Sequence, residues 1–209
     1  QGRLSPIALA STGGDPSRID EVAAGRVRVQ DEGSQLAALA LTRARPVSAG
    51  ERWLDVCAGP GGKAALLAAE AALGGATLVA NEVVPARAGL VRNALAVFGD
   101  GPDAPTVVEG DGRRFGAEPS RFDRILLDAP CTGLGALRRR PEARWRKSKG
   151  DLDALVALQA ELIDSAVAAL APGGLLAYVT CSPHVRETHE QVDAALARHP
   201  HLRPVDTPA

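Results

Sequence analysis

Two continuous apolar runs stand out in the hydrophobic pattern, and each leads into a cysteine. The first is Ile125-Leu126-Leu127, followed by Asp128-Ala129-Pro130-Cys131. The second is Leu175-Leu176-Ala177-Tyr178-Val179, followed by Thr180-Cys181. A run without polar alternation is typical of a strand that is buried on both faces of a parallel sheet. Ligands of open α/β sheets bind at the carboxyl ends of such strands, so we expect both cysteines at a functional edge.

Strand and helix patterns alternate along the rest of the chain. Apolar residues recur at helical spacing over 151–171, and Pro172-Gly173-Gly174 is expected to end that helix. Ser34 is the expected N-cap of a helix over 35–43. Pro85 opens a helix whose expected apolar stripe is Ala86, Leu90, Ala94 and Val97. The other predicted helices are 64–72 and about 185–198, and the other strands are 52–57, 77–83, 106–111 and a short alternating one within 25–30.

This alternation predicts an α/β fold with a mostly parallel sheet, right-handed crossovers and helices on both faces. Residues 1–26 have weak periodicity and are interpreted as a linker or the remnant of a preceding segment, and 27–209 as one domain. Three cysteines, an odd number, do not make a disulfide framework and favour a reduced, cytoplasmic setting. The sequence shows no 18-residue apolar run and no signal peptide. It does not begin with Met, so we expect a processed or trimmed piece.

The net charge of −1 hides a strongly basic segment. Residues 138–149 read RRRPEARWRKSK, with seven basic residues and one Glu, so the rest of the chain carries −7. A basic segment around a tryptophan, on an otherwise acidic chain, indicates an anionic partner at one place. The expected nucleic-acid contacts are Arg138, Arg139, Arg140, Arg144, Trp145, Arg146 and Lys147.

A glycine-rich turn, 57–63, follows the strand over 52–57 and opens a helix, so that backbone amides face a ligand. It is no P-loop, because Cys57 stands where that motif has Gly and Ala64 stands where it has Ser or Thr. Gly59-x-Gly61-x-x-Ala64 fits a dinucleotide fingerprint loosely. The predicted strand ends also carry four acids: Asp55, Glu82, Asp111 and Asp128. Four negative charges suit an adenosine with a sulfonium cation better than a pyrophosphate. The acids therefore favour S-adenosylmethionine as the cofactor.

The cysteines indicate which reaction would use this cofactor. Carbon 5 of a pyrimidine is a poor nucleophile, but a thiolate that adds to carbon 6 activates it toward the sulfonium methyl group. An acid then stabilises the adduct at ring nitrogen 3, and a base removes the proton from carbon 5. Asp128, Lys63, Cys131 and Cys181 cover these roles, whereas Cys57 is expected to pack beside the turn. No cysteine pair has the close spacing of a zinc site.

These motifs together resemble the Sun/Fmu family of RNA cytosine-5 methyltransferases, and most closely its bacterial RsmB-like members, which act on ribosomal RNA. The most specific stretches are Asp128-Ala129-Pro130-Cys131 and Thr180-Cys181-Ser182. Supporting stretches run from about residue 26 over nearly the whole chain: Val29-Gln30-Asp31, Ser34-Gln35, 54–63, Gly110-Asp111-Gly112-Arg113, 122–127, Arg139 with Pro141 and Trp145, and Tyr178-Val179.

The resemblance implies a Rossmann-like S-adenosylmethionine-dependent methyltransferase fold, methylation of a cytosine in 16S ribosomal RNA, and a role for each site residue. Cys181 would be the nucleophile on carbon 6, and Cys131 would assist product release. Asp128 would contact the base beside the cofactor, and the basic segment would lie where RNA enters. The implied cofactor-binding residues are Cys57, Ala58, Gly59, Pro60, Gly61, Gly62, Lys63, Glu82, Arg87, Asp111 and Asp128.

The chain departs from the family pattern in four places. Glu82 stands where Asp is commoner, and Gly59 stands where Ala is frequent. No amino-terminal RNA-binding domain is recognisable, and only Leu202 to Asp206 is available for a closing pair of strands, so we expect a catalytic domain cut at both ends. We also expect a monomer without metal or membrane contact. The alternatives are a nucleotide-cofactor (NAD-type) oxidoreductase built on Gly59-x-Gly61-x-x-Ala64, and a non-catalytic RNA-binding remnant.

Overall fold

The fold is a five-stranded sheet in which every strand is parallel to its neighbours. The computed structural model describes residues 2–10, 13–117, 121–139, 141, 145 and 148–206. The strand order is β3-β2-β1-β4-β5, so the chain starts in the middle of the sheet and builds outward in both directions. The strands are β1 (Arg52–Asp55), β2 (Thr77–Glu82), β3 (Thr106–Glu109), β4 (Phe122–Asp128) and β5 (Leu170–Val179).

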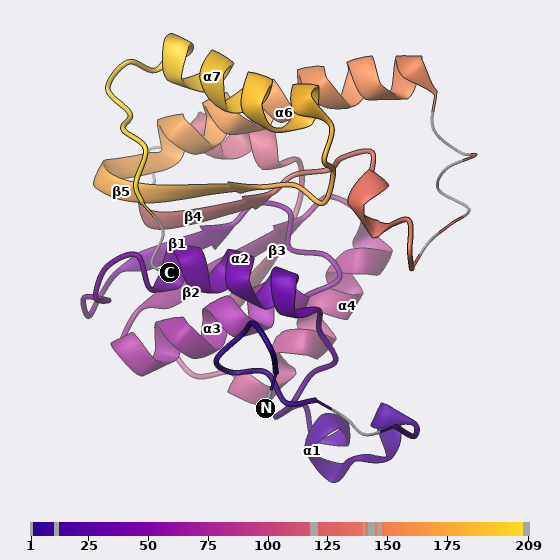
Figure 1. Cartoon of the computed structure of the whole chain (residues 1–209). Helices are drawn as coiled ribbons and strands as arrows, with labels where there is room; N and C mark the ends of the chain where they lie inside the picture. The colour runs from indigo at the N-terminus through magenta and orange to yellow at the C-terminus, as the bar shows by residue number, and fades with distance from the viewer. Residues whose placement is uncertain are drawn as a thin grey trace.

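Helices cover both faces of this sheet (Figure 1). One layer holds α2 (Glu32–Thr42), α3 (Gly62–Gly74) and α4 (Pro85–Leu95), and the opposite layer holds α6 (Lys149–Ala169) and α7 (His189–Arg198). The predicted parallel α/β fold is therefore confirmed. Short elements complete the chain: α1 (Asp20–Ala23), η1 (Pro16–Arg18), η2 (Ala96–Phe98), η3 (Gly112–Gly116), η4 (Leu134–Ala136) and η5 (Val185–Glu187). No helix in the described ranges is both long enough and apolar enough to cross a membrane.

Strand β4 shows why a continuous apolar run marks a central strand. Successive side chains of a strand point to opposite faces. Leu126 packs into the core under α2, α3 and α4, and Ile125 and Leu127 pack into the core under α6. All three are completely buried. An apolar residue is therefore needed at every position, and polar residues are confined to the strand ends.

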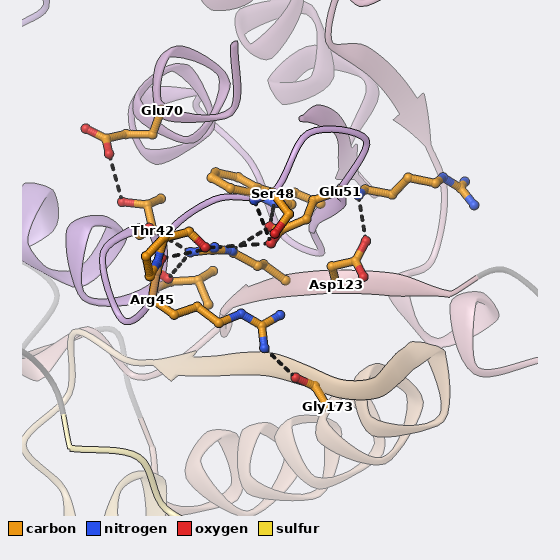
Figure 2. Close-up of polar contacts among 12 residues, drawn as sticks. Thr42, Arg45, Ser48, Glu51, Glu70, Asp123 and Gly173 are labelled. Atoms are coloured by element: carbon orange, nitrogen blue, oxygen red, sulfur yellow. Dashed lines mark hydrogen bonds and ion pairs between the residues drawn. The ribbon is translucent and has the colours of Figure 1, made fainter. Parts of the chain in front are cut away.

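The amino-terminal end of the sheet is fixed by a buried arginine, Arg124. Its Nε donates to Glu51 Oε2 at 2.7 Å, and its guanidinium lies 5.0 Å from the centre of the Trp53 ring. The remaining N–H groups donate to the carbonyls of Leu41, Thr42, Arg45 and Pro46. Figure 2 shows this cluster around Glu51 and Thr42. Arg45 also reaches the carbonyl of Gly173 at 2.7 Å, so the same loop contacts β5.

The amino-terminal residues contact α2. Glu32 accepts hydrogen bonds from the backbone amides of Arg3, Leu4 and Ser5, and the Ser5 hydroxyl donates to Gln35 Oε1 at 2.7 Å. Ser5 is buried as a result. The division of the chain at residue 26 stays a prediction.

Several local predictions were wrong. Residues 25–30 form no strand, and α2 begins three residues early with Asp31 as N-cap, which places Ser34 inside the helix. The α4 stripe is also rotated, because the helix buries Ala88, Val91, Ala94 and Leu95 and leaves Leu90 and Val97 exposed. Helix α6 ends at Ala169, before Pro172, and β5 follows at once, with an irregular register between Phe122 and Arg124 of β4.

Candidate active site

The two motif cysteines meet at the carboxyl edge of the sheet. Strands β4 and β5 are neighbours, with Asp128 opposite Val179, and the amide of Ala129 continues the pairing by donating to the Val179 carbonyl at 2.9 Å. The loops after the two strands therefore leave the sheet side by side. Cys131 Sγ lies 3.3 Å from Cys181 Sγ. The sequence-based expectation that neighbouring strands bring both thiols within reach of one small substrate is met by this geometry.

The hydrogen bond between the thiols makes Cys131 acidic. Donation from Cys181 lowers the pKa of Cys131 to about 6 against the effect of burial, and hydrogen bonds from Thr180 and the Gly133 amide contribute. The same bond raises the pKa of Cys181, as do its burial and the charge on Cys131. The pair thus shares one proton and carries one negative charge near neutral pH. In the free protein, Cys131 is the better thiolate.

An ion pair lies at the same edge. Lys63, at the start of α3, contacts Asp128, at the end of β4, with 2.8 Å between Nζ and Oδ2. Both groups lie close enough to the thiols to affect the pKa of Cys181, which Asp128 raises and Lys63 lowers. The structure therefore brings together all four residues that the sequence singled out for chemistry.

The glycine turn packs tightly between β1 and α4. Gly61 has a φ of +106°, and a Cβ atom there would lie 2.6 Å from the Cβ of Ala94, so both the backbone and the packing require glycine. The Ala58 amide donates to the Asn81 carbonyl at 2.8 Å, which ties the turn to β2. Helix α3 begins at Gly62, so its free amides face the carboxyl edge. Cys57 is largely buried in the turn, and this burial raises the pKa of its thiol.

Glu82 closes one side of the turn. Its carboxylate accepts hydrogen bonds from the amides of Gly59 at 3.0 Å and Val84 at 2.9 Å, and the side chain is almost inaccessible. Arg87 lies 3.5 Å from Glu82 and donates to the Gly59 carbonyl at 2.5 Å. The structure thus places Gly59, Glu82 and Arg87 in one cluster, as expected for parts of a single site.

Asp111 stands apart from that cluster. It caps η3 by accepting from the Arg113 amide at 2.9 Å, and its carboxylate also contacts the Arg113 guanidinium. Hydrogen bonds from that side chain lower the pKa of Asp111. The carboxylate is half exposed at the correct edge, but Arg113 occupies it in this structure.

Asp55 lies at the end of β1. It is one of the four acids expected at strand ends but was not among the predicted site residues. It is 1% exposed, and neither carboxylate oxygen has a hydrogen-bond partner with ordinary geometry among the described residues. Burial raises the pKa of Asp55 to about 8, the charge of Asp128 adds to the effect, and Lys63 and the nearby Cys57 amide oppose it. Asp55 is therefore largely protonated at neutral pH, and both members of the Lys63–Asp128 pair influence its pKa.

Sequence reasoning missed Glu187 altogether. This carboxylate is completely buried beside both cysteine loops, where it contacts Thr132 and Gln159. No local pattern marked it, because a single Glu at the start of a surface helix is most often solvated. The only usable signal was its position six residues after Cys181.

The basic segment begins where it was expected, directly after the Cys131 loop. The Gly135 amide donates to the Cys181 carbonyl at 2.8 Å, which ties the residues just before the segment to the second cysteine loop. Arg138 and Arg139 are exposed, and Arg139 forms an ion pair with Asp31. Trp145 is 84% exposed. The predicted contacts Arg140, Arg144, Arg146 and Lys147 lie outside the described residues. Across the described part of the chain, no group of three or more His, Cys, Asp or Glu residues could hold a metal ion.

Comparison with known proteins finds a family and relatives that are similar to this chain. The family described as 16S rRNA methyltransferase RsmB/F matches residues 44–209. "Putative methyltransferase MT1451" of Mycobacterium tuberculosis is 50% identical over 199 residues, which are 95% of this chain and 42% of that protein. Ribosomal RNA small subunit methyltransferase B of Salmonella typhi is 39% identical over 181 residues, which are 85% of this chain and 40% of that protein.

A solved structure agrees with both relatives. NSun6 from Pyrococcus horikoshii, determined with SFG, has a TM-score of 0.74 and 25% identity, over 88% of this chain and 46% of that one. These findings confirm the predicted Rossmann-like methyltransferase fold, the dependence on S-adenosylmethionine and the resemblance drawn from the motifs. They do not support the oxidoreductase alternative. The chain spans less than half the length of the two curated relatives, and over that span it belongs to the RsmB/F family of 16S rRNA methyltransferases.

Proposed function

We propose that this protein transfers a methyl group from S-adenosylmethionine to carbon 5 of a cytosine in RNA, with 16S ribosomal RNA as the substrate. The pair of thiols 3.3 Å apart at the carboxyl edge carries this proposal. Methyl transfer to an oxygen or an exocyclic nitrogen needs no thiol. Transfer to carbon 5 needs one thiol to activate the ring and a base to take the proton from carbon 5.

The residues present fit the cofactor. When bound, S-adenosylmethionine supplies an electrophilic methyl group on a sulfonium cation. The amides at the start of α3 and the tight turn at Gly59 and Gly61 offer a backbone surface without side chains. Glu82 and Asp111 offer carboxylates for the adenosine, and Asp128 offers a carboxylate near the cation. The buried carboxyl of Asp55, close to the Cys57 amide, is a further polar group next to the glycine turn.

The two cysteines divide the reaction between them. Cys181 transfers its proton to the Cys131 thiolate, which releases it to solvent, and the Cys181 sulfur forms a bond to carbon 6 of the cytosine while Asp128 stabilises the ring at nitrogen 3. After carbon 5 has received the methyl group, Cys131 accepts the proton from carbon 5. The electron pair of that C–H bond restores the ring double bond, and the bond between carbon 6 and Cys181 breaks. The lowered pKa of Cys131 supports its role as the base, because it is a thiolate at neutral pH. One proton then leaves the protein in each turnover.

The basic segment provides the contact with RNA. It follows Cys131 directly, and its exposed members Arg138 and Arg139 can contact phosphates. Arg140, Arg144, Arg146 and Lys147 extend the positive charge along the sequence, and the exposed ring of Trp145 can stack on a base. The target cytosine has to be unpaired or flipped out to reach the thiols. The cytoplasmic location and the monomeric state stay predictions.

Methyl transfer from tritium-labelled S-adenosylmethionine tests this function. The purified protein is incubated with 16S ribosomal RNA, both free and in small-subunit particles, and the product is mapped by bisulfite sequencing. We expect a label at one cytosine that resists conversion. A methyl group on another atom would reject the two-cysteine chemistry. Cofactor binding without transfer to either substrate would instead support the RNA-binding remnant.

A further inference from the structure

The residues that follow the two cysteines meet at one buried carboxylate. Thr132 follows Cys131, Ser182 follows Cys181, and their hydroxyl oxygens lie 3.0 Å apart. Glu187 Oε2 accepts a hydrogen bond from the Thr132 hydroxyl at 2.5 Å, and Glu187 Oε1 accepts from the Thr132 amide at 2.9 Å. Both cysteine loops are therefore tied to a single side chain directly behind the thiols.

Glu187 is itself held from two further elements. Gln159, in the middle of α6, donates to Glu187 Oε1 at 3.0 Å and to the Pro130 carbonyl at 2.9 Å. The Tyr178 hydroxyl, on β5, donates to the backbone carbonyl of Glu187 at 2.8 Å. Glu187 ends η5, just before α7. Its position is thus fixed by the sheet and by α6.

The carboxylate is charged despite its burial. Burial raises the pKa of Glu187, but hydrogen bonds from Ser182, Thr132 and Gln159 outweigh it and lower the pKa below its usual value. All of these donors are uncharged. A buried anion without a cationic partner is costly unless every lone pair is used. Such an anion organises its donors strongly, because each hydrogen bond to a charged acceptor is about twice as strong as one between neutral groups.

We propose that Glu187 is a positioning residue that sets the distance between the two thiols by holding Thr132 and Ser182 together, an inference that rests on the proposed two-cysteine methyl transfer. Glu187 acts through the residue next to each cysteine and does not touch the reacting atoms. The separation of 3.3 Å between the sulfur atoms keeps the hydrogen bond that makes Cys131 acidic. Loss of the carboxylate should let the loops move apart and weaken this bond.

Glu187→Gln tests the proposal, because the amide keeps the shape of the side chain but not its charge or its full acceptor capacity. The readout is the rate of iodoacetamide alkylation of each cysteine as a function of pH, measured by peptide mass spectrometry in the free protein. In the wild type, Cys131 should titrate with a pKa of about 6. In Glu187→Gln the pKa should rise toward the ordinary thiol value, so that alkylation of Cys131 at pH 7 falls at least about tenfold. Methyl transfer should fall at least about tenfold as well.

The direction of the shift separates positioning from a simple charge effect. Removal of a nearby negative charge lowers the pKa of a thiol, whereas loss of the hydrogen bond between the thiols raises it. A lowered pKa, or an unchanged titration with unchanged methyl transfer in a folded variant, would overturn the proposal. If Glu187→Gln does not fold, Thr132→Val decides in its place, because it removes one donor and keeps the shape. It should shift the pKa in the same direction by a smaller amount, and no shift would count against the proposal.

A matched control comes from the opposite layer of helices. Glu70 is a largely buried carboxylate of α3 that accepts from the Thr42 hydroxyl at 3.3 Å (Figure 2) and pairs with Arg43 at 2.9 Å, and it has no contact with either cysteine loop among the interactions of the described residues. Glu70→Gln should lower stability and leave the thiol titration unchanged. The titration uses no RNA, so it is independent of the proposed substrate. If the wild type methylates no cytosine, the proposed function fails, and the titration still decides whether Glu187 sets the thiol geometry.

Discussion

A Cβ atom on Gly59 would lie 2.2 Å from Oε2 of Glu82, the same oxygen that accepts the Gly59 amide. The backbone at Gly59 does not require glycine, since its φ lies outside the left-handed region. The Glu82 carboxylate, together with Arg87 Nε at 2.8 Å, is what excludes a methyl group there. The two departures from the family pattern, glycine at 59 and glutamate at 82, are therefore in direct contact, and the glycine leaves room for the glutamate.

This relationship predicts a double-mutant cycle. Gly59→Ala should weaken S-adenosylmethionine binding about tenfold, or about 1.4 kcal/mol, because Glu82 has to leave the two amides that hold it. Gly59→Ala combined with Glu82→Asp should recover most of that loss, since the shorter side chain vacates the space. Isothermal titration calorimetry measures both affinities. Additive losses in the double variant would contradict the compensation.

Replacing each cysteine should block the reaction at a different step. Cys181→Ala should abolish methylation, because no bond to carbon 6 can form. Cys131→Ala should still form that bond but should not release it, so a covalent protein–RNA adduct accumulates. Denaturing gel electrophoresis with labelled RNA detects the adduct. An adduct that forms in Cys181→Ala instead would reverse the two roles.

The acidity of Cys131 should depend on Cys181. In the wild type, alkylation of Cys131 should increase with pH through a pKa of about 6 and level off above it, as the thiolate becomes the only form. Cys181→Ala removes the largest cause of the lowered pKa and leaves burial, which acts in the opposite direction. The pKa of Cys131 should then rise, and alkylation at pH 7 should fall several-fold. A titration that is the same in both proteins would show that the hydrogen bond between the sulfur atoms is not formed in solution.

Arg124 should matter for stability and not for the thiols. Arg124→Leu leaves Glu51 buried without its cation and leaves the carbonyls of the 41–46 loop without donors, so unfolding should become easier by about 3–5 kcal/mol. Urea denaturation measures this loss. Arg45→Ala is the matched control, because it removes one hydrogen bond of the same loop, to Gly173, and should cost less than about 1 kcal/mol.

The basic segment should be detectable in the salt dependence of RNA binding. Replacing Arg138, Arg139 and Arg140 with Ala should weaken binding, because fewer phosphates are neutralised. The slope of log affinity against log salt should flatten by up to about 0.7–0.9 for each phosphate that the variant no longer binds. Arg43→Ala with Arg45→Ala, at the amino edge of the sheet, should leave the slope unchanged. An unchanged slope in the first variant would exclude this segment as the RNA-binding surface.

Sequence patterns predicted the elements of the sheet better than the phase of its helices. A strand buried on both faces needs apolar residues at every position, so β4 was unmistakable. On α4 the helical period was correct but the buried side was not, because Leu90 and Val97 are the large apolar residues and yet face outward. Val91 and Leu95 pack into the core in their place, and Ala94 lies against Gly61, a contact that only the tertiary arrangement shows.

The site was predictable where motifs mark it and not where its contacts are long-range. Cys131, Cys181 and Asp128 follow strands, and a strand end has a known place in a parallel sheet. Glu187 is part of the site because it contacts Thr132, which is 55 residues away in sequence. The pairing of Asp111 with Arg113 could not be predicted either, because a carboxylate that follows a strand can contact a ligand or a residue next to it in the sequence.

Because β4 and β5 are neighbours, the residues that carry out the reaction and the segment that selects the substrate lie in different parts of the chain. The basic segment and α6 form the crossover that leaves β4 after the first thiol and returns to β5 before the second. Because the backbone pairing of the two strands fixes where that crossover starts and ends, its outer part can gain, lose or exchange residues without moving either sulfur atom. Relatives with the same pair of strands could thus come to recognise different RNA structures while the methyl-transfer step stays the same.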